Sequence, residues 1–214
     1  MTDKTIKRIT GIYGILPADL ATDDLLKRAE AALKGGAKTL QFRDKKQGYK
    51  QALKRGKALR DLTVQYDAKL MINDSIQLAH DTGADGVHLG KGDIESLTQL
   101  RQHAGEGLIL GVTCRADAVF GKEARESGAD YLSFGAVFPT HSKPEVPVIG
   151  LPRLQKAKQL FPAANVVAIG GITLATIPAI KKTGVDAVAV ISGLFAAEDI
   201  ELTARQMVGA WELR

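Results

Sequence analysis

Short apolar runs rich in valine, isoleucine and leucine alternate with amphipathic segments along the whole chain. Such runs are typical of buried strands, whereas apolar residues spaced about three to four positions apart are typical of helices. No linker-like stretch interrupts the alternation. The expected strands are residues 9–16, 39–42, 69–72, 86–89, 108–113, 131–134, 166–169 and 187–191.

The segments between these runs predict helices. The first helix has the clearest ends, because Thr22 offers an N-cap and two acidic residues follow it. Gly35 and Gly36 then end the helix. The last predicted helix covers about residues 200–211.

Eight strands, each followed by a helix, predict a protein of the α/β class. Both faces of the strands are apolar enough to be buried, which is typical of a parallel sheet. We therefore expect a single α/β domain over residues 1–214, a (β/α)₈ barrel. An open, doubly wound sheet is the alternative.

A short motif recurs between a helix and each even-numbered strand. Its four copies are Gly36-Ala37-Lys38, Gly83-Ala84-Asp85, Gly128-Ala129-Asp130 and Gly184-Val185-Asp186. Glycine at this point supplies the left-handed residue that ends a helix. The repeat is therefore structural, and it favours the barrel over the open sheet.

The net charge of +5 is spread over amphipathic segments such as residues 49–60. This distribution indicates solvated helix faces and suits small anionic substrates, and it predicts no nucleic-acid partner. No apolar run approaches the length of a membrane span, and residues 1–10 lack the apolar stretch of a secretory signal, so we expect neither feature. The single cysteine, Cys114, excludes an internal disulfide. We expect a cytoplasmic protein with no membrane partner.

The predicted carboxyl ends of the strands are polar, and barrel enzymes build their active sites there. The residues at these ends are Gln41, Arg43, Asp44, Lys45, Asn73, Asp74, Asp93, Thr113, Thr140, Ser142, Lys143, Gly170, Gly171, Ser192 and Gly193. We expect them to converge on one mouth of the barrel.

Arg43 and Lys45 lie two positions apart, so on an extended segment they face the same side. Together with Gln41 they form a cationic set that suits a diphosphate. A surface ion pair with Asp44 or another nearby acid is the alternative, and the local sequence favours neither.

Asp74 and Asp93 follow adjacent strands and offer two carboxylates at the same mouth. Magnesium takes one or two protein carboxylates together with substrate phosphate and water, so this pair predicts a magnesium site. The alternative for Asp74 is an N-cap of a helix over residues 75–81. Asp93 has a similar alternative at the start of a helix near Glu95.

Gly170-Gly171, together with Ser192-Gly193, follows the last two strands, where many barrels hold a phosphate on backbone N–H groups. A tight turn is the alternative for the double glycine. The loop over residues 138–144 is either a closing lid or a solvated loop.

Several common catalytic signatures are missing from the sequence. It contains no HExxH zinc site, GxSxG elbow, P-loop or GxGxxG fingerprint. Cys114 has no visible activating partner. We interpret His88, inside an apolar strand, as a hydrogen-bonded interior histidine rather than a catalytic one.

Several motifs now appear in a recognisable order. They are Gln41-Phe42-Arg43-Asp44-Lys45, Ile72-Asn73-Asp74, the run from Gly83 to Gly90 that leads to Asp93, Gly111-Val112-Thr113, the run from Tyr131 to Lys143, the run from Ala168 to Thr173, and the run from Val188 to Ser192. The set resembles the thiamine-phosphate synthase family over about residues 13–192.

The resemblance implies a transferase that joins a hydroxymethylpyrimidine diphosphate to a thiazole phosphate and releases pyrophosphate, with magnesium as cofactor. The residues implied to hold the pyrimidine diphosphate are Gln41, Arg43, Lys45, Asn73 and Lys143, and Asp74 and Asp93 are implied to bind the metal. Thr113 would contact the pyrimidine or its leaving group. The residues implied for the thiazole phosphate are Thr140, Ser142, Gly170, Gly171, Ile191 and Ser192. A homodimer is a further expectation from the family.

The sequence departs from the family pattern at three places. Thr113 replaces a serine and keeps the hydroxyl, and Phe42 replaces a leucine and should face the protein interior. The first strand is altered around Asp19, whose contribution stays open. The rival functions are a thiazole tautomerase on the same barrel, which needs no diphosphate clamp, and a non-catalytic ligand-binding protein.

Overall fold

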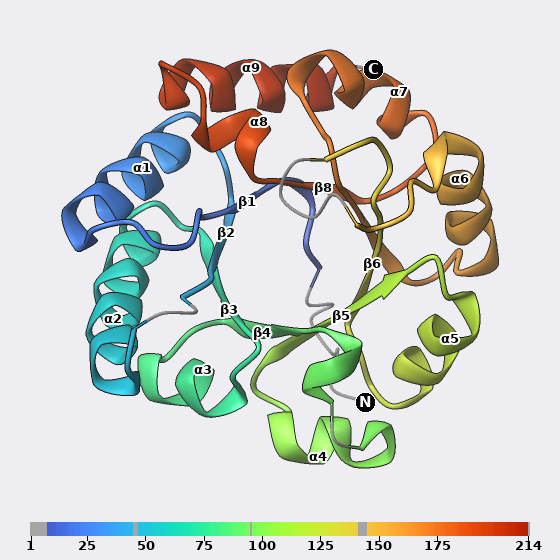
Figure 1. The fold of residues 1–214 in the computed structure, drawn as a ribbon, viewed down its shortest axis with the longest axis horizontal. Coiled ribbons are helices and arrows are strands. Elements are labelled where there is room, and N and C mark those ends of the chain that lie inside the picture. Colours follow the sequence, from blue (N-terminus) through green and yellow to red (C-terminus); the bar gives the residue numbers. More distant parts are fainter. Residues whose placement is uncertain (1–7, 45–46, 95, 141–144, 214) are drawn as a thin grey trace.

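A computed structural model describes residues 8–44, 47–94, 96–140 and 145–213. Eight parallel strands form a closed barrel in chain order, and β8 pairs with β1 (Figure 1). The strands are β1 (Gly11–Ile15), β2 (Thr39–Phe42), β3 (Lys69–Asn73), β4 (Gly86–Leu89), β5 (Ile109–Arg115), β6 (Tyr131–Gly135), β7 (Asn165–Ile169) and β8 (Ala187–Val190). The barrel prediction is confirmed, and the open sheet is wrong.

The helices surround the ring of strands (Figure 1). They are α1 (Thr22–Lys34), α2 (Tyr49–Gln65), α3 (Ile76–Thr82), α4 (Leu100–Ala104), α5 (Ala118–Glu126), α6 (Gly150–Leu160), α7 (Ile177–Lys181), α8 (Ser192–Phe195) and α9 (Ile200–Glu212), with 3₁₀ turns η1 (Lys91–Asp93), η2 (Leu97–Gln99) and η3 (Leu174–Thr176). Within the described ranges, no helix has the length and apolar character to cross a membrane.

The predicted helix ends need one correction. Ala21, rather than Thr22, occupies the N-cap position of α1, and no side chain caps it. Thr22 is instead the first helical residue, with Asp23 and Asp24 in the first turn as expected. The acids stabilise the positive end of the helix dipole without a capping hydroxyl.

Apolar side chains form two separate layers. The inner layer fills the barrel and includes Tyr13, Met71 and Tyr131. The outer layer lies between the strands and the helices and contains Phe42, whose ring centre lies 5.6 Å from the Arg55 guanidinium carbon. Because alternate residues of a strand face opposite sides, Phe42 points away from the barrel axis, into the buried layer under the helices. The prediction that it faces the protein interior is confirmed.

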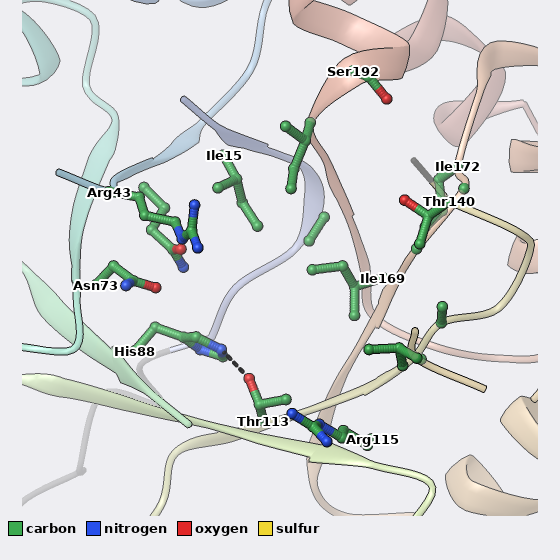
Figure 2. A pocket seen from close by; sticks show the side chains of 18 residues that line it. Ile15, Arg43, Asn73, His88, Thr113, Arg115, Thr140, Ile169, Ile172 and Ser192 are labelled. Carbon is green, nitrogen blue, oxygen red and sulfur yellow. Dashed lines mark hydrogen bonds between the residues drawn. The ribbon is translucent and has the colours of Figure 1, made fainter. Parts of the chain in front are cut away.

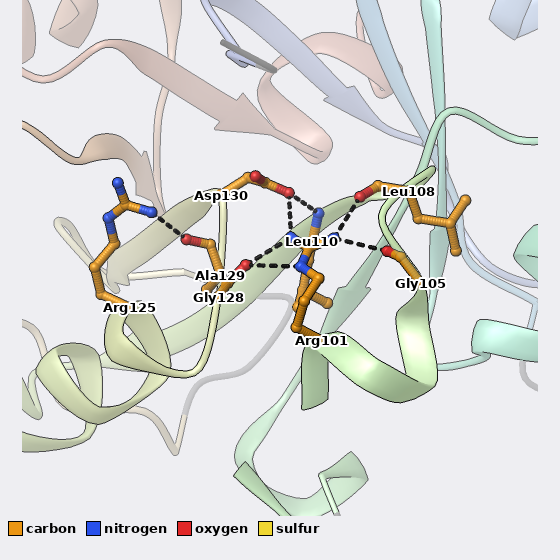
Figure 3. A network of polar contacts seen from close by, with 8 residues as sticks. All are labelled: Arg101, Gly105, Leu108, Leu110, Arg125, Gly128, Ala129 and Asp130. Atoms are coloured by element: carbon orange, nitrogen blue, oxygen red, sulfur yellow. Dashed lines mark hydrogen bonds and ion pairs between the residues drawn. The ribbon is translucent and has the colours of Figure 1, made fainter. Parts of the chain in front are cut away.

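Three aspartates of the recurring motif fasten the barrel at the amino ends of its strands. Asp130 shows the pattern, because one carboxylate oxygen accepts the Leu110 N–H of β5 at 2.7 Å and pairs with Arg101 of α4 at 2.6 Å (Figure 3). Asp85 binds Leu70 N–H and Arg60 in the same way, and Asp186 binds Val166 N–H and Lys158. Each aspartate therefore joins two neighbouring strands and a helix.

The fourth copy of the motif has a lysine in place of the aspartate. Lys38 donates from Nζ to the backbone oxygen of Tyr66 at 2.9 Å. The motif glycines Gly36, Gly83, Gly128 and Gly184 all have positive φ angles. The prediction that the repeat is structural, with left-handed glycines at the helix ends, is therefore confirmed.

Replacing Asp130 by alanine should lower the free energy of unfolding by about 2 kcal/mol, because a partly buried N–H and an arginine both lose a charged acceptor. Urea denaturation measures this loss. The control is Glu126→Ala, which breaks the exposed 3.8 Å pair with Lys122 and should change stability little. Equal losses in the two variants would contradict the role given to Asp130.

Candidate active site

Two adjoining cavities open at the carboxyl ends of the strands, each with about 1,000 Å³ of empty space including open solvent. The residues that line both cavities are Arg43, Asn73, His88, Thr113 and Arg115. Because these residues are shared, the cavities form one cleft.

The first polar group comes from β2 and the residues that follow it. Gln41 is only 2% exposed, and its Nε2 donates to the Tyr13 hydroxyl. Arg43 lines both cavities. Asp44, suggested by the sequence as a surface partner for Arg43, forms a buried ion pair with Arg55 at 2.6 Å. Lys45 lies outside the described residues.

The structure brings Asp74 and Asp93 to the wall of the same cavity, together with Asn73. The capping alternative for Asp74 is wrong, because Ser75 caps α3 through the 3.1 Å bond that its Oγ accepts from Leu78 N–H. Asp74 itself has a φ of 65°, a conformation that is strained for a non-glycine residue and often found at functional sites.

Asp93 closes the short turn η1, and its Oδ2 accepts the Gly90 N–H at 2.9 Å. It does not start a helix, since η1 ends at this residue and η2 begins at Leu97. Within the described residues, no group of three or more histidine, cysteine or acidic side chains forms a metal cluster. A metal ion here therefore depends on the two carboxylates and on oxygen atoms of a ligand.

Thr113 lies between the two ends of the cleft, and its hydroxyl is hydrogen-bonded to His88 (Figure 2). His88 is 8% exposed and is bonded at both ring nitrogens, to Thr113 and to Tyr131. The interpretation of His88 as a hydrogen-bonded interior histidine is thus confirmed.

Small and apolar residues form the other end of the cleft. The predicted residues found there are Thr140, Gly170, Gly171, Ile191 and Ser192. Figure 2 shows Thr140 and Ser192 across the cavity from Arg43 and Asn73. Ser142 and Lys143 lie outside the described part of the chain.

The two glycines after β7 have a packing reason as well as a place in the cleft. Both have positive φ angles, and a Cβ on either one would collide with the segment that follows β6. At Gly170 the nearest atoms belong to Ala136, and at Gly171 to Pro139 and Phe138. Both glycines line the cleft without a side chain, so a phosphate can come close to the backbone there.

The sequence prediction missed Arg115, which lines both cavities. The register of β5 against β6 shifts between Thr113 and Arg115, and Arg115 has a φ of 54°. A bulge of this kind re-aims the side chain that follows it. Hydrophobic periodicity gives no signal for a bulge, and the predicted strand ended two residues earlier.

Cys114 lines the cavity that holds the two carboxylates. Burial, with a smaller contribution from the charge of Asp117, raises the pKa of the Cys114 thiol to about 12, so this cysteine is no activated nucleophile. Asp19 follows β1 with a φ of 71° and is not among the residues that line either cavity of the described chain.

Comparisons with known proteins agree on one family. A family model described as thiamine monophosphate synthase matches residues 12–194. The thiamine-phosphate synthase of Methylobacillus flagellatus is 41% identical over 206 residues, which cover 96% of this chain and 97% of the relative. The thiamine-phosphate synthase of Thioalkalivibrio sulfidiphilus is 39% identical over 98% of this chain and 99% of its own length.

A solved structure extends the agreement to three dimensions. The thiamine phosphate pyrophosphorylase from Pyrococcus furiosus superimposes with a TM-score of 0.85 at 34% identity, over 95% of this chain and 96% of its own. With the family model matching most of the barrel, this chain belongs to the thiamine monophosphate synthase family.

Proposed function

We propose that this chain is a thiamine-phosphate synthase that joins an aminopyrimidine methyl diphosphate to a thiazole phosphate. The observation that carries the proposal is one cleft with two different ends. One end holds the carboxylates of Asp74 and Asp93, the other holds the glycines after β7 and Ser192, and Arg43 and Asn73 line both cavities. A cleft of this kind fits two phosphorylated molecules, and Thr113 lies between the ends.

The donor set at the first end fits magnesium. Asp74 and Asp93 line one cavity and provide hard oxygen ligands, and a diphosphate and water complete such a site. When bound, the metal would supply positive charge to the leaving diphosphate. Arg43 and Asn73 line the same cavity and are suited to orient the diphosphate oxygens by charge and hydrogen bonds. Lys45 and Lys143 stay predictions for the same task.

The reaction breaks the bond between the pyrimidine methylene carbon and the diphosphate oxygen. The electron pair leaves with pyrophosphate, and the amino group of the pyrimidine ring stabilises the methylene cation. The thiazole nitrogen then donates its lone pair and forms the new carbon–nitrogen bond, so no proton has to be removed. Charge neutralisation and exclusion of water are the main requirements, and the raised pKa of Cys114 agrees with a reaction that needs no thiolate nucleophile.

The tautomerase alternative fits less well. A tautomerase needs only the thiazole phosphate end, whereas the carboxylates of Asp74 and Asp93 at the other end have no part in such a reaction. The alternative of a non-catalytic ligand-binding protein also gives no reason for the two carboxylates. We propose a single domain that acts in the cytoplasm, and the homodimer stays a family expectation.

Purified protein should form thiamine phosphate and pyrophosphate from the two substrates only when magnesium is present. Asp93→Ala should reduce kcat/KM by about 100-fold, because it removes one of two metal ligands. A coupled pyrophosphate assay measures both effects. The control is Asp199→Ser, which keeps a capping group at the start of α9, away from the cleft. Full activity with a chelator would contradict the metal site, and an inactive but folded protein would contradict the function.

Substitutions at the two ends of the cleft should change KM for different substrates. Arg43→Gln should raise KM for the pyrimidine diphosphate about tenfold and leave KM for the thiazole phosphate unchanged, since one charged contact is lost. Ser192→Ala should raise KM for the thiazole phosphate instead, by a smaller factor. If both variants affect the same substrate, the assignment of the two ends is wrong.

A further inference from the structure

A continuous chain of hydrogen bonds crosses the interior of the barrel and joins two residues of the cleft. Its members come from five different strands in the order Gln41, Tyr13, Tyr131, His88 and Thr113. The successive distances are 2.6 Å, 3.2 Å, 2.8 Å and 2.7 Å. Gln41 and Thr113 line the cleft, whereas Tyr13 and Tyr131 are 1% and 0% exposed. The chain therefore links Gln41 and Thr113 through two fully buried tyrosines and through His88, which itself lines the cleft.

The chain has a direction, because each hydroxyl has only one hydrogen. The Nε2 of Gln41 donates to the Tyr13 oxygen. In the Tyr13–Tyr131 bond either hydroxyl can be the donor, and we infer that Tyr13 donates, because Tyr131 is then the acceptor that its buried hydrogen needs. The Tyr131 hydrogen is then directed onto His88 Nδ1. Burial raises the pKa of both tyrosines, which keeps both hydroxyls protonated and the chain complete.

The direction of these hydrogen bonds fixes which ring nitrogen of His88 carries the hydrogen. With Nδ1 acting as an acceptor, a neutral His88 carries its hydrogen on Nε2 and donates it to Thr113 Oγ1. Thr113 accepts a second, longer bond of 3.4 Å from Ser133. Both acceptor positions of the Thr113 oxygen are thus used. The hydrogen of the Thr113 hydroxyl is left to bond a ligand that enters the cleft.

We propose that Tyr131 is a positioning residue that holds His88 in the Nε2–H form and so makes Thr113 a hydrogen-bond donor to the substrate. The proposal rests on the proposed function and adds which groups of the cleft donate hydrogen bonds and which accept them. An aminopyrimidine diphosphate has an amino group that donates and phosphate oxygens that accept. The Gln41 carbonyl at one end of the chain and the Thr113 hydroxyl at the other match this pair of groups.

The local structure supports a fixed position for Tyr131. Its ring stacks on the His88 ring, with centroids 5.4 Å apart and an angle of 21° between the planes. Gly111 of β5 leaves the space that the Tyr131 ring fills, because a Cβ on that glycine would collide with the ring and its hydroxyl. Packing therefore holds the Tyr131 hydroxyl next to Nδ1 of His88.

The tautomer can be measured directly by ¹⁵N NMR of the histidine side chains in the full-length protein without substrates. The His88 signals are assigned by their loss in His88→Gln. We expect Nε2 to carry the hydrogen and Nδ1 to be bare in the unmodified protein. Tyr131→Phe should shift the population toward the Nδ1–H form. The matched control Tyr13→Phe removes the buried hydroxyl that orients Tyr131 but keeps the Tyr131 donor, so it should retain more of the Nε2–H form than Tyr131→Phe does.

Kinetics give the second readout. Tyr131→Phe should lower kcat about tenfold while KM for the thiazole phosphate stays unchanged, and thermal unfolding of both phenylalanine variants shows that they are folded. His88 protonated at Nδ1 in the unmodified protein, or a Tyr131→Phe variant with unchanged tautomer and kcat, would overturn the proposal. If the protein shows either of these results and still makes thiamine phosphate, only the role of Tyr131 is contradicted, and the proposed function stands.

Discussion

Closure of eight parallel strands into a barrel is the constraint on which the site depends. In a closed parallel barrel all carboxyl ends meet at one mouth, so residues that are far apart in the chain, such as Arg43 and Ser192, line one cleft. The bonds that fasten the strands lie at the opposite mouth, where Asp85, Asp130 and Asp186 join neighbouring strands to helices. The aspartates that join neighbouring strands and the residues of the cleft therefore lie at opposite ends of the barrel.

The interior of the barrel adds a second constraint. A polar group buried there must be hydrogen-bonded, because an unpaired one costs about 1–3 kcal/mol. Tyr13, Tyr131 and His88 meet this requirement together, and in doing so they give the hydroxyl of Thr113 a defined orientation. The same bonds that make the interior stable therefore set which groups of a ligand the cleft accepts. A mobile side chain at this position would need to be ordered on binding.

Most of the fold follows from hydrophobic periodicity, and the strands β2 and β4 have the predicted bounds. What periodicity misses is set by contacts between elements. Whether Asp74 or Ser75 caps α3 depends on backbone angles that a sequence pattern does not show, and the bulge that turns Arg115 into the cleft depends on the register of β5 against β6. The polar ends of the strands were visible as a set, since one rule of barrel topology brings them together. The chain through Tyr13 and Tyr131 was not, because both tyrosines look like ordinary core residues in an apolar strand.

The central claim is that the two ends of one cleft hold two different phosphorylated molecules. A crystal structure of the protein with thiamine phosphate, pyrophosphate and magnesium tests it most directly. The account predicts pyrophosphate and the metal beside Arg43, Asn73, Asp74 and Asp93, and the phosphate of thiamine phosphate against Gly170, Gly171 and Ser192. Pyrophosphate bound at the glycine end, or a metal ion away from both carboxylates, would contradict it.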